Sequence, residues 1–167
     1  LVAAETAILR VDPVTGDTIV VSSGGQFNNV FSIALGGNTG DDIFVTSVRY
    51  EADTGWVGSI IRVNPQDGGQ TIVSDGKNLG FLLGITVQGD DVYVTGLMGH
   101  DSNFGTGQVV HVDASTRIQT VVSQGEKLVR PVGITLDGNG QLIVADRLRP
   151  DPFYFRDHQP DSLMRRF

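Results

Sequence analysis

The sequence contains no cysteine, and this absence removes several classes of protein at once. Disulfide frameworks, thiol catalysis and zinc sites built on thiolates all need cysteine side chains. The sequence also lacks the run of about 18 apolar residues that a membrane-spanning helix requires, so no membrane span is predicted. Basic residues are few: 12 Lys and Arg stand against 19 Asp and Glu, which gives a net charge of −7. Because a phosphate backbone needs a basic surface, we expect no nucleic-acid partner.

Helical periodicity is a further absence. No stretch keeps apolar residues at the spacing i, i+3, i+4 and i+7 for long enough to predict a helix. Glycine, in contrast, is abundant, with 22 of the 167 residues, and a share about twice the ordinary one predicts many turns. Hydrophobic residues make up 40% of the chain, enough for a buried core. The sequence therefore predicts one all-β domain over residues 1–167.

Four short phrases recur three times each, in the same order. The first is TAILRVDP (6–13), GSIIRVNP (58–65) and GQVVHVDA (107–114), in which Arg10, Arg62 and His111 are 52 and 49 residues apart. The second is DTIVVS (17–22), QTIVSD (70–75) and QTVVSQ (119–124); the third is FSIALGG (31–37), LGITVQG (83–89) and VGITLDG (132–138); the fourth is DIFVTS (42–47), DVYVTG (91–96) and QLIVAD (141–146). Each phrase is rich in Val, Ile and Thr and bounded by turn residues, which is the composition of a β-strand.

Four strands in each unit of about 50 residues are typical of the blades of a β-propeller. The segment PVGITLDGNGQLIVAD (131–146) resembles the NHL-repeat and gluconolactonase-like β-propellers, in which a Gly-Ile-x-x-Asp strand leads by a tight turn to a strand ending near Ala-Asp. Two positions depart from that pattern: Ser32 replaces the glycine of Gly84 and Gly133, and Gly96 replaces the aspartate of Asp146. The resemblance implies four-stranded antiparallel blades with the third phrase innermost, then the fourth, the first and the second. Ile85 and Val87, with Ile134 and Leu136 one unit later, are then expected on innermost strands.

The predicted strands make an incomplete propeller of three blades and one extra strand. The repeat units are residues 8–59, 60–108 and 109–162, and a further unit begins at residues 163–167, where DSLMRRF aligns with GSIIRVN. Open sheet edges invite pairing with other strands. We therefore expect the remaining blades to come from the same, longer chain or from a second copy.

Three links between the fourth and first phrases differ from one another, whereas the strands around them repeat. They are residues 48–58, 97–107 and 147–161, and they hold half of the 12 aromatic residues. Aromatic and arginine side chains on loops are typical of binding surfaces, although the same side chains can also pack within their own loop. The predicted binding residues are Tyr50, Trp56, Phe104, Phe153, Tyr154 and Arg156. We therefore expect a noncatalytic interaction or scaffold module that binds a protein or a glycan.

An enzyme is the alternative. The resemblance includes lactonases and lyases, whose sites combine residues from separate blades. The candidates for a divalent-metal site at the channel mouth are His100, Asp101, Asp157 and His158. No nucleophile motif is present, so we assign no catalytic residue and expect no cofactor unless such a metal binds. The Asp137–Gln141 segment begins like a calcium loop but lacks the later glutamate, and it is interpreted as a turn.

Two further expectations follow from composition and alternation. His111 takes the strand position of Arg10 and Arg62, which predicts packing or a contact between blades rather than catalysis; the arginines are expected to bridge to carboxylates of neighbouring blades. We expect an extracellular or periplasmic location, although the same composition also occurs in cytoplasmic proteins.

Overall fold

A computed structural model describes residues 1–4, 6–38, 40–98, 106–125 and 127–147. These residues form strands and turns, and none of them is helical. The strands are β1 (Val2–Ala4), β2 (Ala7–Val11), β3 (Thr18–Ser23), β4 (Asn29–Gly36), β5 (Asp42–Glu51), β6 (Gly55–Val63), β7 (Gln70–Asp75), β8 (Phe81–Gln88), β9 (Asp91–Met98), β10 (Thr106–Asp113), β11 (Gln119–Gln124), β12 (Pro131–Leu136) and β13 (Leu142–Asp146).

The strands form four antiparallel sheets, each in chain order. The first sheet is β1-β2-β3, the second β4-β5-β6-β7, the third β8-β9-β10-β11 and the fourth β12-β13. The expected all-β class and the four-stranded antiparallel sheets are confirmed by the second and third sheets. The third phrase of each unit forms the first strand of a sheet, as expected for Ile85 in β8 and Ile134 in β12.

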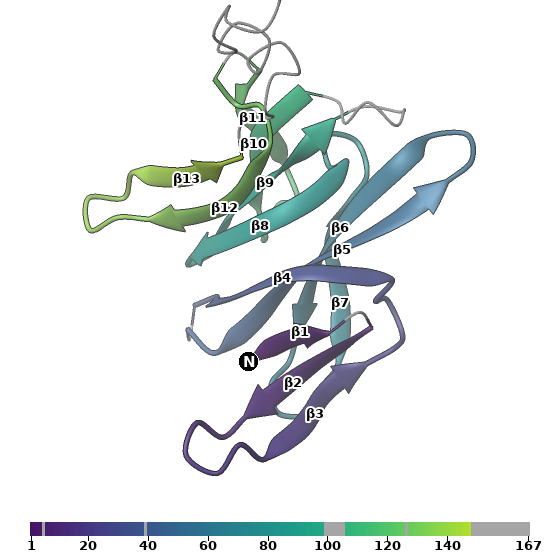
Figure 1. The fold of residues 1–167 in the computed structure, drawn as a ribbon, viewed down its shortest axis with the longest axis vertical. Helices are drawn as coiled ribbons and strands as arrows, with labels where there is room; N and C mark the ends of the chain where they lie inside the picture. The colour runs from purple at the N-terminus through teal and green to yellow at the C-terminus, as the bar shows by residue number, and fades with distance from the viewer. Residues whose placement is uncertain (5, 39, 99–105, 126, 148–167) are drawn as a thin grey trace, which may run out of the picture.

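The first strands of successive sheets are neighbours. β4 contacts β8, β8 contacts β12, and β1 lies against β4, as Figure 1 shows. Within the described residues the sheets do not close into a ring. An irregularity recurs in the first strands, because the register shifts between Val30 and Ser32 in β4, and at the matching places in β8 and β12. Segments with similar sequences therefore have the same local geometry.

Two expectations about the elements differ from the structure. The link 48–58 was predicted to be a long loop, and this is wrong: β5 and β6 continue through most of it and leave only residues 52–54 as a turn. The short strand β1, which the sequence analysis did not predict, adds to β2 at the N-terminus. The strand expected at 163–167 lies outside the described residues.

Two hydrophobic clusters hold the first three sheets together. One lies between the first and second sheets and includes Ile8, Phe27 and Val45; the other lies between the second and third and includes Phe44, Leu79 and Val94. The second sheet is covered on both faces, so residues 43–48 of β5 are all buried. Fully burying one such Val, Ile or Phe side chain contributes about 1.5–3 kcal/mol.

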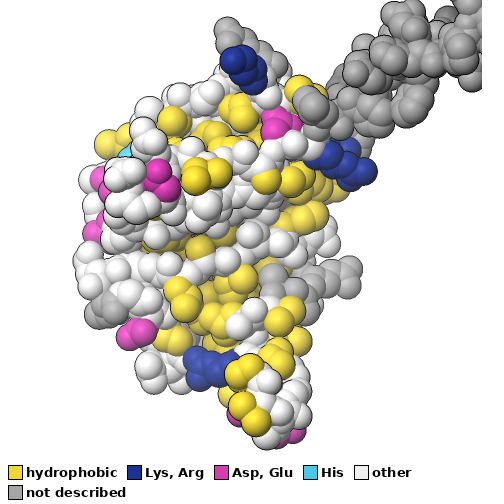
Figure 2. All heavy atoms as spheres, turned by 60° about the vertical axis from the view of Figure 1, so that its left-hand side comes forward, with side chains coloured by type: hydrophobic (Ala, Val, Ile, Leu, Met, Phe, Trp, Pro, Cys, Tyr) yellow, Lys and Arg dark blue, Asp and Glu magenta, His cyan; other side chains and the backbone are white. Residues whose placement is uncertain are grey.

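The outward face of the first sheet is not covered in this way. Val2 pairs with Leu9, and Leu9 pairs with Val20, so these residues share the face opposite Ile8. Val2, Val11 and Val20 are exposed. Figure 2 shows hydrophobic side chains at the surface in the lower part of the molecule, where the first sheet lies. The outward face of the first sheet is therefore apolar and exposed.

The same turn joins the last two strands of each of the first three sheets. Asp12, Asn64 and Asp113 each accept a hydrogen bond from the backbone N–H two residues later, at 2.8 Å. The fifth residue of each turn has a positive φ, 78° at Gly16, 73° at Gly68 and 64° at Arg117. Glycine is required at Gly68 for a second reason, since a Cβ there would lie 2.4 Å from the carbonyl oxygen of Val21 in the first sheet.

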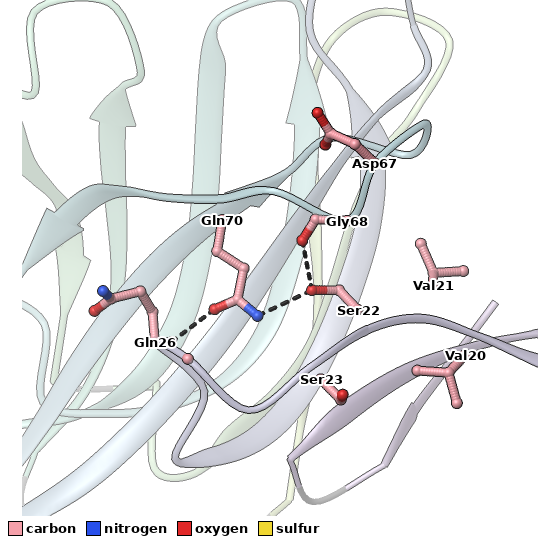
Figure 3. A pocket seen from close by; sticks show the side chains of 9 residues that line it. Val20, Val21, Ser22, Ser23, Gln26, Asp67, Gly68 and Gln70 are labelled. Carbon is pink, nitrogen blue, oxygen red and sulfur yellow. Dashed lines mark hydrogen bonds between the residues drawn. The ribbon is translucent and has the colours of Figure 1, made fainter.

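A glutamine at the start of the outer strand connects the second and third sheets to the sheet before each of them. The Gln70 amide donates to the Ser22 hydroxyl at 2.9 Å and to the Gly24 carbonyl at 3.1 Å, and its oxygen accepts from the Gln26 N–H at 2.7 Å. Figure 3 shows the Gln70 side chain between Gln26 and Ser22. Gln119 makes the matching bonds one sheet later, donating to Ser74 and Gly76 at 2.8 and 3.2 Å and accepting from Asn78 at 2.9 Å.

Candidate binding site on the β5–β6 hairpin

The end of the β5–β6 hairpin projects beyond the other strands of the second sheet. The last residue of β5 that pairs with β4 is Val48, and the first residue of β6 that pairs with β7 is Ser59. Between them, β5 and β6 pair only with each other, up to Glu51 and Gly55. The projecting hairpin is visible in Figure 1. We call this segment, residues 49–58, the hairpin tip.

Four aromatic rings form a continuous row across the tip. Tyr50 and Trp56 are cross-strand partners with ring centroids 5.3 Å apart, and Trp56 lies 4.9 Å from Phe81 of β8. Phe81 in turn lies 5.0 Å from Phe31 of β4. All three contacts are edge-to-face, the geometry in which one ring's positive edge meets another's negative face. We call these four residues the aromatic row.

The two ends of the aromatic row face solvent, whereas its middle is packed. Tyr50 is 60% exposed and Phe31 is 43% exposed. Trp56 and Phe81 are half-buried against the cluster between the second and third sheets. Phe31 is the residue at which β4 shifts its register, and such a bulge turns a side chain away from the regular alternation. The row is therefore anchored in the core and open to a partner at both ends.

An ionic network lies on the opposite face of the hairpin from Tyr50, because Arg49 and Glu51 alternate with Tyr50 along β5. Arg49 holds Asp75 through two hydrogen bonds of 2.7 and 3.0 Å and Glu51 through one of 2.7 Å. The hydrogen bond to Asp75 raises the pKa of Arg49, and the same bond holds the pKa of Asp75 below its ordinary value. The pKa of Glu51 is also lowered, first by the hydroxyl of Thr54 and then by Arg49. All three groups are therefore ionised at neutral pH.

A groove separates the hairpin tip from the link that leads into β8. It is lined by residues of both charges and by apolar ones, among them Arg49, Glu51, Trp56, Asp75, Lys77 and Met98. The network is partly exposed, with about a third of the Arg49 side chain accessible to solvent. The site therefore combines an aromatic surface on one face of the hairpin with fixed hydrogen-bonding groups on the other, and Arg49 and Trp56 both line the groove.

The sequence analysis identified only part of this site. Of the predicted binding residues, Tyr50 and Trp56 lie together at the hairpin tip, on strands rather than on a loop. Phe104, Phe153, Tyr154 and Arg156, and the metal candidates His100, Asp101, Asp157 and His158, lie outside the described residues. Phe31 and Phe81 were missed, because they belong to different units and only the packing of two sheets brings them together.

The basic residues of the first phrase contact their own sheet. Arg62 forms an ion pair with Asp42, and His111 bonds with Asp91 at 2.6 Å; in both cases the acid begins the adjacent strand. The expectation that Arg62 bridges to a neighbouring sheet is therefore wrong. His111 also packs against Tyr93, with ring centroids 4.9 Å apart, which agrees with a packing role.

The described residues show no group of three or more His, Asp or Glu side chains arranged to hold a metal. Asp137 accepts hydrogen bonds from the N–H groups of Asn139 and Gln141, both at 2.8 Å, as the turn interpretation requires. Over the same residues we find no candidate for a membrane-crossing helix. No family model matches the chain, and no curated protein matches it either.

Proposed function

We propose that this chain forms part of a β-propeller that serves as a noncatalytic binding module for a protein or a glycan. The antiparallel sheets follow one another with their first strands side by side, which supports the propeller. A rigid series of sheets is a suitable scaffold for a binding surface that differs from the regular strands around it.

The observation that carries the proposal is the aromatic row. Tyr50 is largely exposed although its partner Trp56 is anchored in the core, so the tyrosine ring is held in place before any partner binds. Pre-positioned aromatic side chains lose little entropy on binding, and Tyr, Trp and Arg dominate the residues that carry binding energy. Arg49 and Glu51, on the other face of the hairpin, supply polar contacts of both signs.

The test uses the single tryptophan of the chain as a reporter. Oligosaccharides, both neutral and acidic, and a random peptide library are screened for a change in Trp56 fluorescence. For a ligand found in this way, Tyr50→Ala is expected to weaken binding by roughly 30-fold, because truncating a central aromatic anchor costs about 2 kcal/mol. Tyr50→Phe keeps the ring and is expected to lose much less.

Val14→Ala is the matched control, because Val14 is 91% exposed and lies in the β2–β3 turn, outside the site. Its affinity is expected to equal that of the unmodified chain. Equal loss of affinity in Tyr50→Ala and Val14→Ala would contradict the proposal. So would a Tyr50→Ala chain that has lost as much stability as affinity, because the ring would then be part of the core.

A further inference from the structure

The third sheet has an outer half that the described chain leaves uncovered. Three positions, two at the end of the outer strand and one in the link that follows it, carry similar residues in successive sheets: a valine, a serine and a large apolar residue. They are Val21, Ser22 and Phe27 in the first sheet, Val73, Ser74 and Leu79 in the second, and Val122, Ser123 and Leu128 in the third.

These positions are buried only where another sheet follows. Val73 is 5% exposed and Ser74 is 7% exposed beneath the third sheet, and Leu79 lies in the core. Two of their counterparts in the third sheet are open: Val122 is 49% exposed, and Ser123 is exposed as well, whereas Leu128 is half-buried. The residue types are the same in the two sheets, so the difference lies in what covers them.

The polar groups of the third sheet repeat the same arrangement. Gln119 binds the Ser74 hydroxyl, the Gly76 carbonyl and the Asn78 N–H, and the counterparts of these groups are the Ser123 hydroxyl, the Gly125 carbonyl and the Lys127 N–H. We call these three groups the Ser123 socket. The Gly125 carbonyl accepts from the Leu128 N–H, just as Gly76 accepts from Leu79, so the local turn is already formed. Among the described residues, no side chain bonds to the Ser123 hydroxyl.

A strand edge lies beside this surface. The fourth sheet, as described, contains only β12 and β13, so β13 presents an edge where the second and third sheets have a third strand. An open edge pairs readily with an added strand. In the second and third sheets, a hairpin of the last two strands (β6–β7 and β10–β11) pairs with the second strand and covers the sheet before it. The β13 edge and the uncovered half of the third sheet are the two surfaces that such a hairpin would contact in the fourth sheet.

We infer that this surface is a docking site for a β-hairpin that completes the fourth sheet. The first strand of the hairpin pairs with β13, and its second strand begins with a glutamine whose amide occupies the Ser123 socket. The hairpin is of the same kind as β10–β11, whose Gln119, Val110 and Val112 cover the matching surface of the second sheet. The inference rests on the packing of the sheets and is independent of the aromatic row.

The experiment adds a hairpin in trans. The probe is a cyclised peptide of residues 107–124, folded as judged by its own NMR spectrum, because cyclisation reduces the entropy lost on binding. It is titrated into isotopically labelled chain, and the amide signals of Lys127, Gly125 and the β13 edge are followed. We expect all three to shift. Replacing the peptide's glutamine, Gln119→Ala, is expected to weaken binding about tenfold, because several hydrogen bonds are lost together.

Two controls keep the result interpretable. Gln124→Ala in the peptide removes a glutamine that makes no such bond and is expected to bind as the unmodified peptide does. Ser123→Ala in the chain leaves the peptide intact and is expected to weaken binding severalfold. No shift at Lys127, or equal binding by the Gln119→Ala peptide, overturns the inference. A dimer of the chain alone, with its Lys127 amide already protected, also overturns it, because a second copy then occupies the surface.

Discussion

At the scale of single residues, Arg117 is the clearest case of strain. It occupies the turn position that Gly16 and Gly68 fill in the first two sheets, with φ at 64°. A side chain in this left-handed region costs roughly 1–2 kcal/mol, whereas glycine adopts it freely. We expect Arg117→Gly to raise the free energy of unfolding by about 1 kcal/mol, measured as a higher urea midpoint.

The reciprocal variant is the control for Arg117. Gly16 has the same conformation, with no atom within 4 Å of a Cβ built on it, so Gly16→Arg adds strain without a collision. It is expected to lower the urea midpoint by a similar amount. Midpoints that move in the same direction in the two variants would show that backbone conformation is not the cause.

Asp113 connects the same turn to acid stability. Hydrogen bonds from Ser115 and Thr116 lower the pKa of Asp113 from 3.8 to about 2. Because the folded pKa is below the unfolded one, the stabilisation is complete above about pH 4 and is lost as the pH falls towards about 2. Asp113→Asn keeps an acceptor, as Asn64 does in the second sheet, but does not titrate.

We therefore expect the unfolding free energy of Asp113→Asn to fall less between about pH 5 and about pH 2 than that of the unmodified chain. Urea titrations at a series of pH values provide the measurement. An equal acid dependence of the two chains would mean that the bonds to Asp113 do not persist in solution.

At the scale of elements, the glutamine that begins β7 and β11 is the polar link between sheets. Gln119 satisfies the Ser74 hydroxyl and the Asn78 N–H, and Ser74 is buried. Gln119→Ala leaves these groups without their partner, so we expect it to lower the free energy of unfolding by about 1–3 kcal/mol. Gln124→Ala, in the same strand but exposed, is expected to change it by less than about 0.5 kcal/mol. Urea unfolding of both variants would show the contrast, and equal effects would contradict it.

The strands themselves were largely predictable from the sequence. Each repeated phrase is bounded by turn residues, so β4, β8 and β12 were expected in the right places. β1 was missed because three residues, Val2–Ala4, carry too little pattern, and only pairing with β2 makes them a strand. The 48–58 link was taken for a loop because charged and turn residues interrupt its apolar pattern, although cross-strand pairs such as Tyr50 and Trp56 extend the hairpin.

The candidate site was only half predictable for a physical reason. Tyr50 and Trp56 are close in sequence, whereas Phe31 and Phe81 join them only through the packing of β4 against β8. A repeat pattern gives no sign of this contact, because Phe31 aligns with Leu83 rather than with Phe81. The glutamine that links the sheets is visible in the sequence, since Gln-Thr begins the second phrase in two units. Its hydrogen-bond partners were not predictable, because they lie in another sheet.

At the scale of the whole molecule, the two ends of the series of sheets are chemically different. The third and fourth sheets present the Ser123 socket and the β13 edge, which require a partner with matching polar groups. The first sheet presents an apolar face at the other end, and its outer strand begins with Thr18 where the second and third sheets have glutamine. Threonine is too short to reach a neighbouring sheet as Gln70 does. The first sheet is therefore expected to associate through apolar contact alone, without a polar link that fixes its register.

This asymmetry predicts which substitution controls self-association of the chain. Val20 is 62% exposed on the outward face of the first sheet, beside Leu9, and a lysine there would place a charge in the middle of the apolar surface. Charged residues on open sheet faces and edges are a common means of preventing association. We expect Val20→Lys to shift the chain towards monomer in light scattering across a concentration series, with its unfolding free energy nearly unchanged.

Val14→Lys adds the same charge at an exposed turn outside this face, and is expected to leave the association unchanged. If both variants reduce association equally, net charge is responsible and the apolar face is not the contact; if neither does, the chain associates through the other end, where the β13 edge lies.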